Sequence, residues 1–163
     1  MQMTRWTRIL LLVGLPLVML GGVACDNDND VTGSGGALAS LNLDVPQTVN
    51  SGVPFDVGLT ATAIGVTNVQ NGVVTVTLPA PLQVTTVDAE AGTSATFTNG
   101  AGATVTWTLN TLDSNTSSTL TIHAMGVLPV GSANQALTIQ SSMVADGISS
   151  GELVANEDFT LAP

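Results

Sequence analysis

The stretch Ala103-Thr-Val-Thr-Trp-Thr-Leu-Asn110 decides the fold class of this chain. Apolar and polar residues alternate along it, so that Val105, Trp107 and Leu109 fall on one side and three threonines fall on the other. An alternation with a period of two is typical of a β-strand with one buried face. We therefore expect a strand here, with Trp107 buried as the marker of the core.

The same alternation recurs along residues 38–163, and turn signals separate its segments. Asn99-Gly100 and Asp146-Gly147 are typical turn dipeptides, and prolines end other segments. Helical periodicity is not found after the first 24 residues. The pattern predicts an all-β fold, a single immunoglobulin-like antiparallel β-sandwich of about seven to nine strands. Besides those of the strand around Trp107, the residues expected to point inward are Leu41, Leu43, Val45, Phe55, Val57, Leu59, Ala61, Ala63, Val74, Val76, Leu78, Leu82, Val84, Leu120, Ile122, Ala124, Leu137, Ile139, Met143, Phe159 and Leu161.

Residues 1–24 have the layout of a secretory signal. Arg5 and Arg8 precede an apolar run over residues 9–20, and small residues lead to Cys25. This ending resembles the cleavage and lipidation box of bacterial lipoproteins, although Gly22 stands where that family usually has Leu, Val or Ile. The resemblance implies that Cys25 carries a lipid anchor, with palmitate among its acyl chains. It also implies export and anchoring in the cell membrane or the outer membrane, with the domain on the periplasmic or extracellular side. The alternative is a secreted protein with a free thiol.

Residues 25–37 read as the lipidated cysteine followed by a flexible tether. Alternating Asp and Asn and then Gly and Ser cannot bury apolar surface. Asp26, Asp28 and Asp30 have the spacing of the first ligands of a calcium loop. That loop needs Gly at its sixth position and Glu at its twelfth, where this chain has Val31 and Ala37. We therefore predict no metal site and no cofactor.

The charge of the chain excludes one class of partner. The formal charge is −10, and the only two basic residues, Arg5 and Arg8, lie in the signal. The chain after the signal carries −12 and has no Lys or Arg, the residues on which phosphate binding rests. We expect no nucleic-acid partner and no electrostatic docking onto anionic lipid. Because Cys25 is the only cysteine, an intramolecular disulfide is impossible.

Three blocks of sequence carry a resemblance to a known family. They are residues 71–84, which end in Leu-Pro-Ala-Pro-Leu-Gln-Val, residues 104–112 around Trp107, and residues 117–122. Together they resemble the immunoglobulin-like bacterial surface domain catalogued as a conserved repeat of unknown function, number eleven, over about Phe55–Val127. The resemblance implies a sandwich on the cell exterior. A weaker likeness to cohesin-type sandwiches lies in Phe55–Val87.

Four groups of residues offer candidate chemistry. Residues 147–151 spell the G-x-S-x-G nucleophile elbow, but that motif needs a following helix and a later histidine, so we interpret them as a turn. His123 is expected to face solvent on its strand, because one histidine alone makes a poor metal site. Asp88 and Glu90 share one strand face, and we interpret them as a solvated pair; the alternative is a cation site or an acid–base pair. Glu157 and Asp158 alternate faces.

These observations favour a non-catalytic protein. After the signal the chain has no Lys, Arg or Tyr and only one histidine, which removes most general bases and oxyanion donors. We expect a lipid-anchored cell-envelope sandwich with a structural, adhesive or protein-interaction role, partnered by the membrane and another envelope protein. The alternative is a carbohydrate-binding module. Its aromatic platform would have to come from Phe55, Phe97, Trp107 and Phe159, all of which lie on positions expected to face the core.

Overall fold

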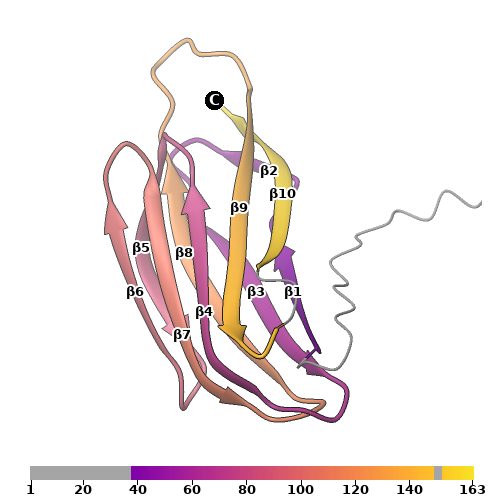
Figure 1. The fold of residues 1–163 in the computed structure, drawn as a ribbon. Helices are drawn as coiled ribbons and strands as arrows, with labels where there is room; N and C mark the ends of the chain where they lie inside the picture. Colours follow the sequence, from indigo (N-terminus) through magenta and orange to yellow (C-terminus); the bar gives the residue numbers. More distant parts are fainter. Residues whose placement is uncertain (1–37, 149–151) are drawn as a thin grey trace, which may run out of the picture.

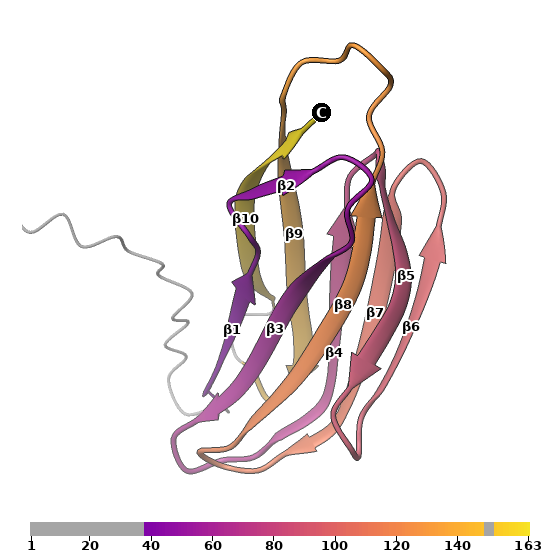
Figure 2. The same ribbon diagram turned by 180° about the vertical axis from the view of Figure 1, so that it is seen from behind.

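The computed structural model describes residues 38–148 and 152–163, and these form two facing β-sheets (Figures 1 and 2). The predicted all-β sandwich is confirmed. Among the described residues no helix is long and apolar enough to cross a membrane. The ten strands are β1 (Leu38–Asp44), β2 (Thr48–Asn50), β3 (Phe55–Ile64), β4 (Val69–Leu78), β5 (Leu82–Ala89), β6 (Ser94–Asn99), β7 (Ala103–Leu112), β8 (Ser117–Gly126), β9 (Gln135–Asp146) and β10 (Leu153–Ala162).

The strands divide between a sheet of four and a sheet of six. The four-stranded sheet has the order β1-β3-β8-β5, and the six-stranded sheet has the order β2-β10-β9-β4-β7-β6. All neighbours are antiparallel except β2, which pairs in parallel with the end of β10. This strand is the one that the sequence analysis missed. Thr48-Val49-Asn50 is too short to carry an alternation, and its partner is more than one hundred residues away in the chain.

The core lies between the two sheets and contains the residues that the alternation placed inward, with the exception of Phe97. Trp107, Val105 and Val76 are fully buried in the six-stranded sheet, and Leu59 and Ile122 face them from the four-stranded sheet. Alternation produces this layer because successive side chains of a strand point to opposite faces. Phe55 and Phe159 meet near its margin, with ring centroids 5.8 Å apart.

Trp107 also joins the core to the connection between the sheets. Its indole Nε1 donates a hydrogen bond to Thr93 Oγ1 at 3.0 Å, and the Thr93 hydroxyl donates to the Glu90 carbonyl at 2.8 Å. Both residues lie in the turn that carries the chain from β5 in one sheet to β6 in the other. The polar end of the largest buried side chain is therefore satisfied where the chain changes sheets.

The Asn99-Gly100 signal forms the expected hairpin between β6 and β7, in which Asn99 lies opposite Ala103. The Asn99 side chain has a second role. Its Oδ1 accepts from the Val84 backbone N–H, and its Nδ2 donates to the Val84 carbonyl, both at 2.9 Å. One amide thus satisfies both backbone groups of a residue on the edge strand β5, which makes that edge less available to another strand.

The expectation that Phe97 faces the core is wrong. Phe97 has the inward phase, since it lies opposite Val105, yet it is 36% exposed. Its strand, β6, is the outermost strand of a six-stranded sheet that faces a sheet of only four. Phe97 therefore has the inward phase but lies at the edge of the sandwich, where it stays partly exposed although β5 contacts β6.

We predict that Trp107→Ala lowers the free energy of unfolding by about 3–5 kcal/mol, the usual cost of removing a large aromatic side chain from a packed core. Chemical denaturation measures the loss. The matched control is Trp107→Phe, which keeps a ring in the core, removes the hydrogen bond to Thr93, and should cost clearly less. A loss below about 1 kcal/mol for Trp107→Ala, a size typical of surface substitutions, would contradict the burial of Trp107.

Candidate functional site

The most unusual cluster of side chains lies on the outer face of the four-stranded sheet, where His123 stands between two carboxylates. His123 Nδ1 lies 2.6 Å from Asp56 Oδ1, and His123 Nε2 lies 2.9 Å from Asp88 Oδ2. The three residues come from the neighbouring strands β3, β8 and β5. The cluster therefore ties three strands together across their solvent side.

Strand register explains why these residues meet. Asp56 lies directly opposite His123 in the pairing of β3 with β8. On the other side, the register of β5 against β8 shifts between Val84 and Thr86, so that Thr86 lies opposite His123 and Asp88 lies two residue pairs further along, on the same face of the sheet. The extra residue, Thr85, donates its hydroxyl to the His123 carbonyl at 3.0 Å. A β-bulge thus brings the Asp88 carboxylate within reach of the ring.

The two carboxylates favour the charged form of the imidazole. The hydrogen bond to Asp88 is the larger cause, and the hydrogen bond to Asp56 is the second; together they raise the pKa of His123 above its ordinary value of 6.5. The His123 side chain is 32% exposed, so the cluster is in contact with water. When protonated, His123 is the only cationic side chain in the described part of the chain, and the cluster then carries a net charge of −1.

The geometry limits what this cluster can do chemically. A general base needs a free ring nitrogen, but both nitrogens of His123 already face a carboxylate oxygen. The two carboxylates lie on opposite edges of the ring, so one ion cannot be bound by the histidine and both aspartates together. The described residues contain no group of three or more His, Cys, Asp or Glu side chains that could hold a metal. The arrangement fits a cross-link within a surface better than a reactive centre.

The surroundings of the cluster are polar and acidic. Asp44, on β1, extends the same outer face and lies opposite Gly58. A shallow hollow of about 570 Å³ spreads over this face from β8 to β1, where Gly58 has no side chain to fill it, and Glu157 lies at its rim. The outer face of the four-stranded sheet, defined by Asp44, Asp56 and Asp88, is hereafter called the acidic face.

The sequence analysis named His123 and Asp88 but did not bring them together. The expectation that His123 lies on the solvent side of its strand is confirmed, and the ring is in addition partly covered and paired with two carboxylates. The expected pairing of Asp88 with Glu90 is wrong. Glu90 lies beyond the end of β5, and its Oε2 accepts a hydrogen bond from the Thr119 backbone N–H at 2.9 Å. Asp56 was missed, because a sequence does not show which strands are neighbours or how they are aligned.

The other candidates fall into two groups. Within the described residues, Glu157 is partly buried and Asp158 is exposed, as their alternation predicted, and Asp158 Oδ1 accepts from the Thr138 hydroxyl at 2.6 Å. Gly147 has a φ of 81° in the predicted turn. Ser149, Ser150 and Gly151 of the G-x-S-x-G spelling lie outside the described residues, as do Cys25, Asp26, Asp28 and Asp30.

Comparison with family models gives no match, and comparison with curated proteins gives none either. Solved structures do match. A cohesin module of a family 33 glycoside hydrolase from Clostridium perfringens superposes with a TM-score of 0.55 at 8% identity, covering 77% of this chain and 98% of the module. The CARDB domain of a Pyrococcus furiosus protein, solved with two metal ions, gives a TM-score of 0.54 at 12% identity, with coverages of 83% and 97%.

BcpA, the major pilin subunit of Bacillus cereus, gives a TM-score of 0.51 at 12% identity, covering 77% of this chain and 40% of the pilin. At such low identities these likenesses establish the fold alone. The chain is a β-sandwich of the kind found in bacterial cohesin and pilin domains. The likeness to cohesins extends well beyond residues 55–87, where the sequence suggested it.

We predict that the pKa of His123, measured by NMR titration of its imidazole, lies above 6.5, and that Asp88→Asn and Asp56→Asn each lower it. Because the folded pKa is raised above the unfolded one, the stabilisation by the cluster is fully present below about pH 6.5 and is lost as the pH rises through the folded value.

The matched control is Asp158→Asn, which removes a carboxylate from the other sheet and should leave the His123 titration unchanged. A His123 pKa at or below 6.5 in the wild-type protein would contradict the cluster. An equal shift in all three variants would show an effect of net charge rather than of contact.

Proposed function

We propose that this chain is a lipid-anchored, non-catalytic β-sandwich of the cell envelope that has a structural or protein-interaction role. The signal layout of residues 1–24 and the small residues before Cys25 support the anchor. The acidic and Gly/Ser-rich tether after Cys25 would hold the folded part near the membrane and leave both sheet faces accessible. We leave the choice between the cell membrane and the outer membrane open.

The observation that supports the interaction role is the arrangement of charged side chains on the acidic face. Its histidine, His123, has both ring nitrogens occupied, which disfavours acid–base catalysis by that residue. The same face offers the carboxylates Asp44, Asp56 and Asp88 on rigid neighbouring strands. A face of this kind favours a protein partner that contributes Lys or Arg, because complementary charge speeds association and fixes orientation.

A fold-level analogy points the same way. The sixth cohesin of scaffoldin B from Acetivibrio cellulolyticus, solved in complex with a Cel5 dockerin, superposes on this chain with a TM-score of 0.52 at 12% identity. It covers 76% of this chain, and 97% of that cohesin is matched. A sandwich of this architecture can therefore serve as a protein-binding module.

The alternative, a carbohydrate-binding module, is less well supported. Phe55, Trp107 and Phe159 are buried, which leaves Phe97 as the only exposed aromatic residue of the described chain. A single phenylalanine on an edge strand offers little of the stacking platform on which such modules rely. We therefore place a protein partner first.

We predict that the wild-type protein sediments with the membrane fraction and that Cys25→Ala moves it to the soluble exported fraction with its signal processing altered. Labelling with a palmitate analogue should be lost in the same variant. The matched control is Ser34→Ala, which changes the tether and should leave both readouts unchanged. Cys25→Ala protein that remains in the membrane pellet with normal processing would contradict the anchor.

The same membranes test the interaction role. Chemical cross-linking of the anchored protein should trap an envelope protein, and the double variant Asp44→Asn/Asp88→Asn should trap it less efficiently than wild type. An unchanged cross-link in that variant would remove the acidic face from the proposal while leaving the anchor intact.

A further inference from the structure

The outer face of the six-stranded sheet carries a regular grid of threonines that the proposed function does not use. Three neighbouring strands each contribute a Thr-x-Thr pair, and the pairs are in register. Thr75 of β4 lies opposite Thr106 of β7, and Thr106 lies opposite Thr96 of β6. A second row, formed by Thr77, Thr104 and Thr98, repeats the arrangement two residues along each strand. The six residues, called the threonine face, are Thr75, Thr77, Thr96, Thr98, Thr104 and Thr106.

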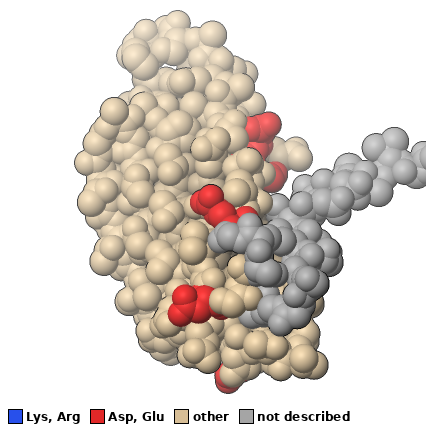
Figure 3. Space-filling view, in the orientation of Figure 1, with Lys and Arg blue, Asp and Glu red and all other residues tan. Residues whose placement is uncertain are grey.

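This face is accessible and has no charge. Thr77, Thr96, Thr98 and Thr104 are exposed, and the other two are half-buried. None of the strands β4, β6 and β7 contains a Lys, Arg, Asp or Glu. Figure 3 shows the result as a broad area without acidic side chains, with the acidic groups gathered toward β9, β10 and the strand ends.

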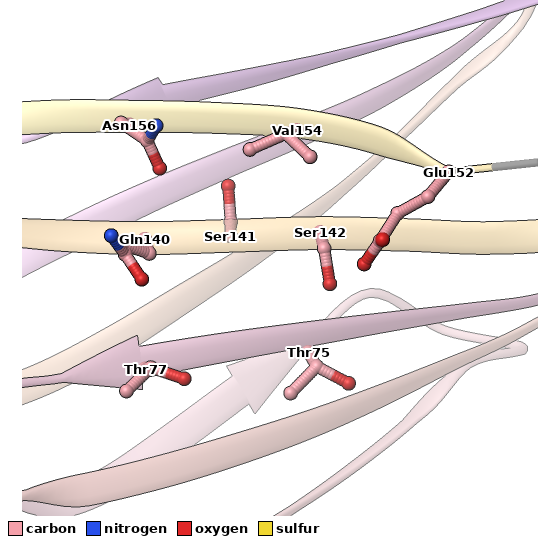
Figure 4. A pocket seen from close by; sticks show the side chains of 8 residues that line it. All are labelled: Thr75, Thr77, Gln140, Ser141, Ser142, Glu152, Val154 and Asn156. Carbon is pink, nitrogen blue, oxygen red and sulfur yellow. The ribbon is translucent and has the colours of Figure 1, made fainter.

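Next to the grid, the surface continues onto β9 and β10. Val73 of β4 and Val144 of β9 lie opposite each other, and their side chains are 39% and 52% exposed. Figure 4 shows the adjoining shallow hollow of about 260 Å³, where Thr75 and Thr77 lie beside polar side chains of β9 and β10, and where Glu152 stands at one end. Methyl groups and neutral hydrogen-bonding groups thus dominate a face of an otherwise acidic protein.

The shape of the sheet decides between possible occupants. Neighbouring strands rotate by about 20–25°, so the three strands of the grid turn through roughly 40–50°. A flat ligand, such as the surface of a crystalline polysaccharide, cannot follow that turn. The grid side of the sheet also presents no aromatic side chain on which a sugar could stack, since Phe97 and Trp107 have the opposite phase. A second twisted sheet, in contrast, packs naturally against a first at about −30°.

We propose that the threonine face is a docking surface for a second copy of this chain. The sandwich segment, residues 38–163, carries nine Asp and Glu residues and no Lys or Arg, so two copies repel each other when their acidic surfaces meet. Two copies that meet through the threonine face bring no charges together. A two-fold arrangement needs the same patch on both partners, and a repeating grid of one residue type is complementary to itself.

The size of the face predicts a weak association. With the adjoining stretch of β9 that carries Val144, the surface spans four strands at about 4.8 Å spacing and six residues at about 3.3 Å rise, or roughly 400 Å² per copy. That is about half of the ~800 Å² per partner found in stable complexes. The dimer should therefore form only at high concentration in solution. On a membrane the lipid anchor proposed above would raise the local concentration, but the association itself does not depend on the anchor.

Sedimentation velocity of residues 38–163, which contain all ten strands and the core, tests the proposal from micromolar to millimolar protein. We expect a concentration-dependent dimer that strengthens as salt increases, because salt screens the repulsion between two acidic copies. Thr106→Glu places two carboxylates in the middle of the interface and should weaken the dimer by about tenfold or more. The matched control is Thr60→Glu on the outer face of β3, which makes the same change in charge on the other sheet.

Each outcome decides the proposal, provided that far-ultraviolet circular dichroism and Trp107 fluorescence show both variants to be folded. Loss of the dimer in Thr106→Glu and its retention in Thr60→Glu supports the threonine face. Equal weakening in both variants would overturn it, because net charge alone would then explain the result. A wild-type segment that stays monomeric at millimolar concentration in high salt, or a dimer that weakens with salt, would overturn it as well.

Discussion

The structure depends on the apolar layer that its alternating strands place between the two sheets. Other means of holding a small domain together are missing from this sequence. Its single cysteine rules out an internal disulfide, and its only Lys or Arg residues, Arg5 and Arg8, lie outside the described part. Ion pairs with His123 are possible, but they lie at the surface, where such pairs contribute little. Core burial must therefore supply most of the stability.

The polar groups near the core are arranged to protect that layer. Trp107 reaches out of the core to Thr93 at the change of sheets, and Asn99 satisfies the backbone of Val84 on the edge strand β5. Ser141, a buried polar residue, donates its hydroxyl to the Ala155 carbonyl at 2.9 Å. Because these contacts hold the interior in place, the outer faces are free to differ. The outer face of the four-stranded sheet is acidic and contains the histidine cluster, and the part of the other outer face that β4, β7 and β6 form is uncharged and rich in threonine.

The sequence was sufficient for properties that depend on one strand at a time. A period of two gave the fold class and the inward side of each longer strand, including the burial of Trp107. The sequence was insufficient for features that depend on how one strand lies against another. Phe97 has the inward phase but lies on the outermost strand of its sheet, where it stays partly exposed, and β2 is too short to show a period.

The histidine cluster could not be predicted from the sequence for the same reason. Asp56 is 67 residues from His123 in the chain, and Asp88 is 35 residues away. Bringing them together needs the order of three strands and a bulge at Thr85. The threonine pairs were visible in the sequence as the polar side of a strand, but their alignment into a grid required the register of β4, β7 and β6.

Native-state amide hydrogen exchange tests most directly whether one shared apolar layer holds both sheets. The account predicts that the slowest amides of β3 and β8 in one sheet, and of β4 and β9 in the other, exchange with the same free energy, equal to that of global unfolding. Amides of the edge strands β2 and β6 should exchange faster. If the central strands of one sheet exchanged much more readily than those of the other, the sheets would not share a cooperative core, and the account would be contradicted.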